Sequence, residues 1–167
     1  MWTKTQLITN DYTGLEGILY NSVLQTRAKK VLELGSDVGD STRIFAEALK
    51  ETGGRLFTVD IIAPKWQQAD MDQFENITVI TANTLELDWN EPIDLLYIDD
   101  NHDYAHVIQE LNKFGSFMRE DGRILLHDVY HDKYGVGILR AVYEYGRDRG
   151  LPFKVWPYSR GLAEIYV

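Results

Sequence analysis

Short apolar runs alternate with amphipathic stretches of helical periodicity along this chain of 167 residues. One of the runs, IDLLYID, is apolar on both faces, which is typical of a parallel strand covered by helices on each side. The alternation therefore predicts an α/β fold, a doubly wound, Rossmann-like sheet of about seven strands. The expected strands of the sheet core are residues 30–35, 55–60, 77–81, 93–99 and 122–128.

The last two strand-like runs, PFKVWPY and GLAEIYV, are separated by only a few residues around Arg160. A connection this short joins antiparallel neighbours, because parallel neighbours need a crossover of about a dozen residues or more. We therefore expect a mostly parallel sheet with a C-terminal antiparallel hairpin and one reversed strand at or near the edge. Residues 1–167 are expected to form one domain, with an N-terminal helical segment at 1–29 and the sheet core at 30–167.

Two of the expected helices have clear apolar periodicity. The helix after the first strand is expected to have Asp40 or Ser41 as its N-cap and to stop at Gly53. A long helix is expected from Tyr104 to Met118, because apolar side chains recur there at helical spacing.

The charge of the chain restricts its partners. The formal net charge is −9, and the 17 Lys and Arg residues form no basic stripe. Nucleic acid and anionic membranes are therefore poor candidates, since a phosphate backbone needs clustered cations. The absence of cysteine excludes disulfides and thiolate metal sites. The first residues lack the apolar core of a signal peptide and no apolar stretch is long enough for a membrane span, so the sequence predicts a cytoplasmic protein.

The segment VLELGSDVGDST is a strand that stops at Gly35, turns, and opens into a helix after Gly39. Backbone N–H groups in such a turn face a ligand at the carboxyl end of the sheet. A triphosphate-binding loop needs Lys after its second glycine, and a dinucleotide fingerprint needs a middle glycine where this chain has Asp37. Acidic side chains such as Glu33 and Asp37 would repel a pyrophosphate and favour a ligand with a cationic head.

Asp60 closes the next strand, where a carboxylate can accept both hydroxyls of a ribose. An acidic turn beside a ribose-binding acid favours a positively charged nucleoside, and S-adenosylmethionine is the common one. Two alternatives stay open on these residues alone: a glycine turn that binds no cofactor, and a strand-end acid that only caps a helix.

Four segments in this order, VLELGSDVGDST, FTVDI, IDLLYIDDNHDYAHV and GRILLHDV, resemble the motifs of class I S-adenosylmethionine-dependent methyltransferases. The similarity is to the branch that contains small-molecule O-methyltransferases of antibiotic and sugar pathways. It implies that the turn binds the methionine side of the cofactor, that the acid after the second strand binds the ribose, and that Asn83 lies by the adenine. The cofactor-binding residues implied by the resemblance are Glu33, Gly35, Ser36, Gly39, Ser41, Asp60, Ile61, Asn83 and Asp99.

Acidic and histidine side chains follow the fourth and fifth expected strands, in IDDNHDY and LLHDVYH. Neighbouring parallel strands end side by side, so Asp99 and Asp128 are expected to share a divalent cation, with His127 as a further ligand. Hard oxygen ligands favour Mg²⁺, which would lower the pKa of an acceptor hydroxyl. Related O-methyltransferases carry a metal at the matching positions. In the alternative interpretation, Asp99 contacts the cofactor while His127 and Asp128 cap the next segment.

One position departs from the family pattern, which has a second acid two residues after Asp99 where this chain has Asn101. An amide cannot take a proton at neutral pH, so the role of general base is vacant or has moved. We expect His102 to replace it, because its reference pKa of about 6.5 suits the role, with Asp100 as the next candidate. The expected catalytic group is therefore Asp99, Asp100 and His102. The alternative is that His102 only forms hydrogen bonds within the turn.

The sequence thus predicts an S-adenosylmethionine-dependent methyltransferase that methylates a small hydroxylated metabolite on oxygen, assisted by a divalent metal. Tyr130 and Tyr134 are expected to line the acceptor pocket. The short N-terminal segment leaves the acceptor site either open or completed by a second subunit of a homo-oligomer. The competing interpretations are a binding or scaffold domain that has lost catalysis, which Asn101 favours, and an NAD-dependent oxidoreductase, which the acidic turn disfavours.

Overall fold

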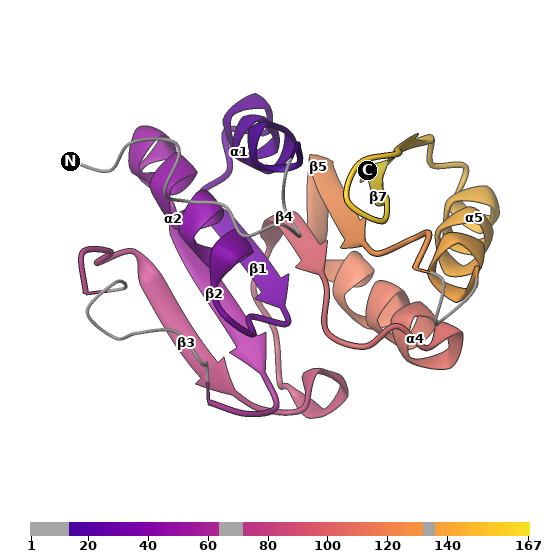
Figure 1. The fold of residues 1–167 in the computed structure, drawn as a ribbon, viewed down its shortest axis with the longest axis horizontal. Helices are drawn as coiled ribbons and strands as arrows, with labels where there is room; N and C mark the ends of the chain where they lie inside the picture. The colour runs from indigo at the N-terminus through magenta and orange to yellow at the C-terminus, as the bar shows by residue number, and fades with distance from the viewer. Residues whose placement is uncertain (1–13, 64–71, 132–135) are drawn as a thin grey trace.

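The computed structural model describes residues 14–63, 72–131 and 136–167. The described strands form a seven-stranded sheet in the order β3-β2-β1-β4-β5-β7-β6 (Figure 1). They are β1 (Lys30–Leu34), β2 (Arg55–Asp60), β3 (Ile77–Thr81), β4 (Ile93–Ile98), β5 (Met118–His127), β6 (Phe153–Trp156) and β7 (Leu162–Tyr166).

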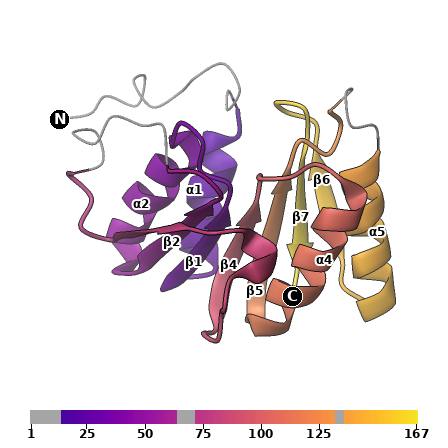
Figure 2. The ribbon, with the colours of Figure 1, turned by 90° about the horizontal axis from the view of Figure 1, so that it is seen from below.

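Helices cover both faces of this sheet (Figure 2). On β4, Leu95 and Tyr97 pack towards the helices at Glu16–Gln25 (α1) and Asp40–Thr52 (α2), while Leu96 and Ile98 pack towards those at Tyr104–Phe114 (α4) and Gly137–Arg149 (α5). Every residue of β4 is buried, as expected for a parallel strand between two helical layers. The helices are α1 (Glu16–Gln25), α2 (Asp40–Thr52), α4 (Tyr104–Phe114) and α5 (Gly137–Arg149), with short 3₁₀ turns η2 (Thr84–Glu86) and η3 (Gly115–Phe117).

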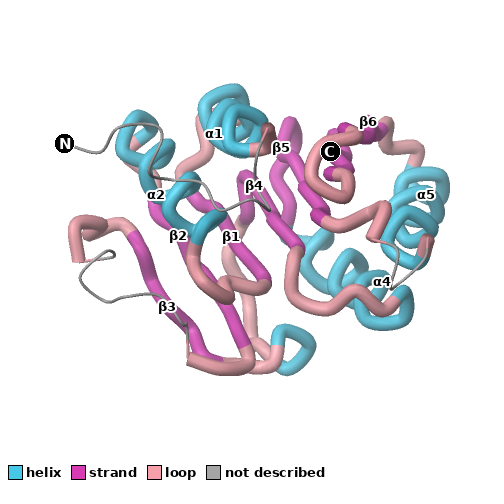
Figure 3. The backbone as a smooth tube through the Cα atoms, in the orientation of Figure 1, coloured by secondary structure: helices cyan, strands magenta, loops and turns pink. Residues whose placement is uncertain are grey.

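The strand directions confirm the predicted fold class. From β3 through β2, β1 and β4 to β5 the neighbours are parallel, whereas β7 is antiparallel to both β5 and β6. The reversed strand is therefore one place from the edge of a Rossmann-like sheet. The parallel strands end at one edge, and the loops that follow them there are traced in Figure 3. Among the described helices, none combines the length and the apolar character needed to cross a bilayer.

The start of α2 differs from the prediction. Its N-cap is Gly39, whose φ of 85° lies in the left-handed region, and Asp40 is already the first helical residue. The Ser41 hydroxyl donates to the buried carboxylate of Glu33 (2.5 Å), and Asp40 forms an ion pair with Arg43 (2.6 Å). Asp40 and Ser41 are residue types that can cap a helix, but in the folded protein their side chains bind Arg43 and Glu33 instead.

The end of α4 also differs from the prediction. The helix stops at Phe114, and Met118 is the first residue of β5, where it pairs with Ile93 of β4. An apolar residue four positions after Phe114 fits a helical period, but the chain turns through η3. Gly115 permits this turn to lie against α5, since a Cβ at Gly115 would collide with the hydroxyl of Tyr145.

Candidate active site

A cavity of about 480 Å³ opens at the carboxyl ends of the parallel strands. Its wall comes from the turn after β1, the segments after β2 and β3, and the ends of β4 and β5 with the loops that follow them. Glu33, Gly39 and Ser41 are not among the residues that line it. The predicted site residues that do line the cavity are Gly35, Ser36, Asp60, Ile61, Asn83, Asp99, Asp100, His102, His127 and Asp128.

The carboxylate of Asp60 closes the turn after β1. Its Oδ2 accepts hydrogen bonds from the backbone N–H of Ser36 (3.0 Å), the Ser36 hydroxyl (3.2 Å) and the N–H of Asp37 (3.1 Å), while Oδ1 accepts from the N–H of Ile62 (3.2 Å). Partial burial acts to raise the pKa of Asp60, but these hydrogen bonds outweigh it and hold the pKa below its ordinary value. The N–H groups of Ser36 and Asp37 thus donate to a carboxylate of the protein itself.

Gly35 brings the turn against the end of β4. Its φ is 91°, and a Cβ on this residue would lie only 2.5 Å from the backbone oxygen of Asp99. The Gly35 N–H donates to the carbonyl of Val59 on β2 (2.8 Å). The glycine is therefore required by the close approach of two strand ends, which places the turn and Asp99 in the same cavity.

Glu33 lies behind the cavity wall, on the α1–α2 side of β1. Its carboxylate accepts hydrogen bonds from the hydroxyls of Ser41 (2.5 Å) and Thr42 (2.6 Å) and is fully buried. Burial raises the pKa of Glu33 to about 7, although the hydroxyl hydrogen bonds oppose the rise. Of the two acids Glu33 and Asp60, both predicted to bind the cofactor, only Asp60 lines the cavity, whereas Glu33 connects β1 to the first turn of α2.

Replacing Glu33 with glutamine is expected to flatten the pH dependence of stability. A carboxyl group whose pKa is about 7 in the folded protein, against an ordinary value of 4.5, binds more protons when the protein is folded. Its contribution to the free energy of unfolding is therefore fully present below pH 4.5 and is lost as the pH rises to about 7. The loss is about 3 kcal/mol, since one pKa unit corresponds to about 1.4 kcal/mol.

Urea unfolding at several pH values between these limits measures this effect. The wild-type protein should lose more stability than Glu33→Gln over the same interval, because the other titrating groups are common to both. Parallel stability curves for the two proteins would contradict the raised pKa of Glu33.

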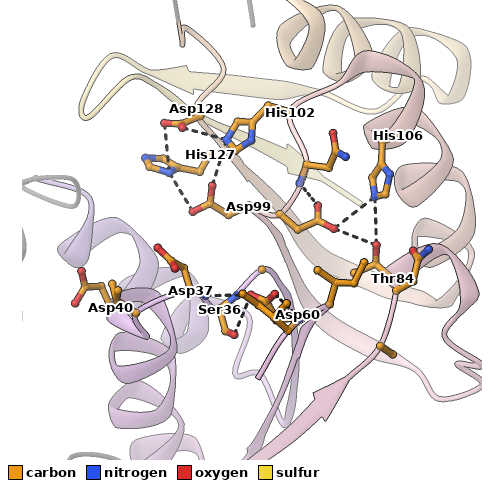
Figure 4. Close-up of a pocket in the computed structure, with 18 of the residues that line it drawn as sticks. Ser36, Asp37, Asp40, Asp60, Thr84, Asp99, His102, His106, His127 and Asp128 are labelled. Atoms are coloured by element: carbon orange, nitrogen blue, oxygen red, sulfur yellow. Dashed lines mark hydrogen bonds and ion pairs between the residues drawn. The ribbon is translucent and has the colours of Figure 1, made fainter. Parts of the chain in front are cut away.

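The ends of β4 and β5 bring two carboxylates and two imidazoles together (Figure 4). His102 Nε2 lies 3.0 Å from Asp128 Oδ2 and 3.7 Å from Asp99 Oδ1. One ligand atom from each of Asp99, His102 and Asp128 lies within 4.8 Å of the other two, so these three residues are arranged to share a cation. We call them the strand-end cluster.

His127 takes a different place from the one expected of a metal ligand. Its Nε2 lies 2.9 Å from the carbonyl oxygen of Ser159, and its Nδ1 lies 3.2 Å from Asp99 Oδ2. Both partners are hydrogen-bond acceptors, so both ring nitrogens of His127 are engaged. Burial acts to lower the pKa of His127, but Asp99 and Asp128 raise it above its ordinary value. The group of side chains arranged for a cation thus contains His102 in place of the predicted His127.

Asp128 is held in a strained conformation at the end of β5. Its φ is 58°, and neighbouring backbone bonds from Val129 and Tyr130 to the β6–β7 loop hold the segment. Oδ2 pairs with His102 and with Arg160 Nη1 (3.2 Å), whereas Oδ1 is buried and accepts no hydrogen bond from the described residues. Burial acts to raise the pKa of Asp128, but His102, His127 and Arg160 lower it.

Asp100 and Asn101 face away from the strand-end cluster. Asp100 Oδ2 accepts a hydrogen bond from the Thr84 hydroxyl (3.0 Å) and lies 3.4 Å from His106 Nε2. Asn101 Oδ1 accepts from the N–H of Asp103 (2.9 Å), which closes the turn before α4. Asp100 and His102, the two predicted candidates for the general base, therefore face different parts of the cavity.

The remaining predicted residues lie towards the β3 side of the cavity or outside it. Ile61 is 69% exposed at the rim, and Asn83 Oδ1 accepts from the N–H of Leu85 at the start of η2 (3.1 Å). Tyr130 is 47% exposed and is not among the lining residues, and Tyr134 falls outside the described residues.

Several residues of this site were not predicted from the sequence. Thr84, His106 and Arg160 line the cavity, and Glu110 stands behind it. The spacing of four residues between His106 and Glu110 on a predicted helix was a usable signal, since it places both on one face. Arg160 gave no such signal, because it reaches the cavity only through the β6–β7 loop.

Comparisons with known proteins agree with this geometry. A family model described as a methyltransferase domain matches residues 32–129, more than half of the chain. A Staphylococcus aureus protein assigned as a caffeoyl-CoA O-methyltransferase has a TM-score of 0.76 and 15% identity, over 95% of this chain and 84% of that one.

Two similar structures contain S-adenosylhomocysteine (SAH). Methyltransferase PaMTH1 from Podospora anserina has a TM-score of 0.69 and 16% identity, over 98% of this chain and 81% of that one. An O-methyltransferase from Bacillus cereus has a TM-score of 0.67 and 17% identity, over 100% of this chain and 82% of that one. These identities establish a shared fold, and the family model establishes membership. The chain therefore belongs to the methyltransferase domain family, and it shares its fold with methyltransferases whose structures contain SAH.

Proposed function

We propose that this protein transfers the methyl group of S-adenosylmethionine to an oxygen atom of a small hydroxylated molecule, with a divalent cation at the strand-end cluster. The observation that carries the proposal is the position of this cluster, in the same cavity as the glycine turn and Asp60. The similar proteins described as O-methyltransferases support the choice of oxygen as the acceptor atom.

The cofactor is proposed to lie across the turn after β1. Gly35 and Ser36 would contact its methionine part, and Asp60 would accept the ribose hydroxyls, since Oδ1 has capacity beyond its bond from Ile62. Ile61 and Asn83 would border the adenine at the ends of β2 and β3. Glu33, Gly39 and Ser41 support this cofactor site from behind its wall.

The strand-end cluster fits a divalent cation by its donor atoms. Two carboxylates converge with an imidazole, and the buried Oδ1 of Asp128, which lies 3.6 Å from His127 Nδ1, accepts no hydrogen bond from the described residues. Asp99 and Asp128 offer the oxygen ligands that Mg²⁺ prefers, and His102 adds a nitrogen that also suits Mn²⁺ or Zn²⁺. A cation held there would lower the pKa of an acceptor hydroxyl and orient it.

His102 is proposed to accept the proton that the acceptor hydroxyl loses. Asp128 lies 3.0 Å from Nε2 and stabilises the resulting imidazolium. The hydroxyl oxygen forms the new bond to the methyl carbon while the carbon–sulfur bond of the cofactor breaks, which leaves SAH. As the base, His102 would take the proton at Nδ1 while Nε2–H donates to Asp128; as a cation ligand it would use Nε2, so the two roles belong to different states of the enzyme.

A second candidate is a cofactor-binding domain without catalysis. Asn101 favours it, because the amide stands where the family pattern has an acid and is engaged in the turn before α4. The two candidates differ in turnover and agree in cofactor binding.

Calorimetry with SAH, followed by an acceptor screen, tests the proposal. The wild-type protein should bind SAH, and Asp60→Asn should bind at least about tenfold more weakly, since an amide N–H₂ cannot accept a ribose hydroxyl. Asp121→Asn, an exposed change at the start of β5, should bind like the wild type.

The screen offers hydroxylated metabolites with Mg²⁺ and then with a chelator. Methyl transfer to oxygen that the chelator suppresses would support the proposal. SAH binding without transfer to any acceptor would favour the non-catalytic candidate, and absence of SAH binding at millimolar ligand would refute both.

A further inference from the structure

A second group of ligand-type side chains lies at the other end of the cavity. Asp100 comes from the β4–α4 loop, and His106 and Glu110 come from successive turns of α4. Figure 4 shows His106 and Thr84 at this end, away from the strand-end cluster. We call Asp100, His106 and Glu110 the α4 cluster.

The distances within the α4 cluster match a metal coordination shell. His106 Nε2 lies 3.3 Å from Glu110 Oε1 and 3.4 Å from Asp100 Oδ2. A tetrahedral Zn²⁺ ion with bonds of about 2.0–2.1 Å has ligand atoms about 3.3–3.4 Å apart, so the two measured spacings equal the edges of such a shell. The Thr84 hydroxyl, 3.3 Å from His106 Nε2 and 3.0 Å from Asp100 Oδ2, borders the same point.

The burial of Glu110 provides a second indication of a ligand. Its side chain is 0% exposed, and apart from the ion-pair contact of Oε1 with His106 Nε2 (3.3 Å) neither carboxylate oxygen has a hydrogen bond of good geometry from the residues that the structure describes. Burying a polar group without a hydrogen bond costs free energy, so such a group in a folded protein calls for a partner. Lys113 lies nearby, but its Nζ donates to the carbonyl oxygens of Thr84 (3.1 Å) and Leu85 (2.8 Å).

We infer that the α4 cluster is a binding site for a divalent transition metal of the Zn²⁺ type, distinct from the strand-end cluster. Its ligands are Asp100 Oδ2, His106 Nε2 and Glu110 Oε1, and one position is left towards the cavity, which Asp100 and His106 line. One imidazole among carboxylates favours Zn²⁺, Co²⁺ or Ni²⁺ over Mg²⁺. A metal there ties the β4–α4 loop to α4 beside η2, and so stiffens the cavity wall next to Asn83. The inference does not depend on methyl transfer.

Metal titration of the chelator-treated protein tests this site. All titrations use an Asp128→Asn background, which disables the strand-end cluster and isolates the α4 cluster. In this background Zn²⁺ should bind with one equivalent measured by calorimetry, and Co²⁺ should give the visible absorption of a tetrahedral site. Adding Glu110→Gln, which keeps the size and shape of the side chain, should weaken Zn²⁺ binding at least about tenfold, as should adding His106→Gln.

Two controls separate loss of a ligand from loss of the fold. Circular dichroism and thermal unfolding without metal should be alike for the background protein and the Glu110→Gln variant. Glu51→Gln, an exposed change on α2, should leave Zn²⁺ affinity unchanged. The inference is overturned if folded Glu110→Gln binds Zn²⁺ as tightly as its background does, or if the background binds no Zn²⁺ at millimolar metal.

Discussion

Gly35→Ala is expected to destabilise the protein by about 2–5 kcal/mol and to abolish SAH binding. The added Cβ causes both backbone strain and a steric clash. The residue has a φ of 91°, a conformation that disfavours any side chain. The added Cβ would also lie 2.5 Å from the backbone oxygen of Asp99, where no flexible side chain can move away. The ends of β1 and β4 must separate, and the cofactor turn moves with them.

Urea unfolding and SAH calorimetry measure the two effects of this substitution. Gly150→Ala is the matched control, because Gly150 also has a positive φ (68°) but no described atom lies within 4 Å of its Cβ position. It should cost only about 1 kcal/mol, from backbone strain alone, and should leave SAH binding intact. Equal losses of stability in the two variants would show that close packing against Asp99 contributes nothing.

Asp128→Asn is expected to lower turnover at least about 100-fold while changing SAH affinity by less than about threefold, in line with the usual contribution of acid–base and metal-binding groups. Asparagine tolerates the left-handed conformation that Asp128 adopts at φ 58°, so the backbone of the segment is retained. The change removes the negative charge that pairs with His102 and Arg160, and with it a carboxylate ligand for the proposed cation.

Steady-state kinetics with an acceptor from the screen measure turnover, and calorimetry measures SAH binding. Asp121→Asn is the control, since Asp121 also has a positive φ (66°) but lies on the exposed part of β5, far along the strand from His127. It should keep full activity. If Asp128→Asn retained most of its turnover, neither the cation nor the His102–Asp128 pair would take part in methyl transfer.

Much of the fold was predictable because its determinants are local. The apolar run of β4 and the glycine after β1 depend on residues that are neighbours in the chain. The short link between β6 and β7 leaves only an antiparallel pairing, which the structure confirms. The failure at Met118 has the same origin: a local pattern that fits a helix was overruled by pairing with Ile93 on another strand.

The candidate site was predictable only to the level of the strand ends. Parallel strands end at one edge, so Asp99 and Asp128 had to be near each other whatever the details. Which imidazole joins them was not determined by this rule, because His102 and His127 both lie at strand ends. In the structure both imidazoles lie beside the carboxylates, but the carbonyl of Ser159 on the β6–β7 loop engages Nε2 of His127, and the group arranged for a cation contains His102.

The sequence by itself determined the α/β class, the reversed strand and the edge of the sheet at which the candidate site lies, because periodicity and short connections act over a few residues. Only the tertiary structure decided the directions of individual side chains: Glu33 behind the wall, Asp60 into the turn, Asp100 towards α4. The direction of a side chain at a strand end depends on which hydrogen-bond and ion-pair partners lie on each side of it. Those partners come from distant parts of the chain, so the spacing of residues in the sequence does not predict the direction of the side chain.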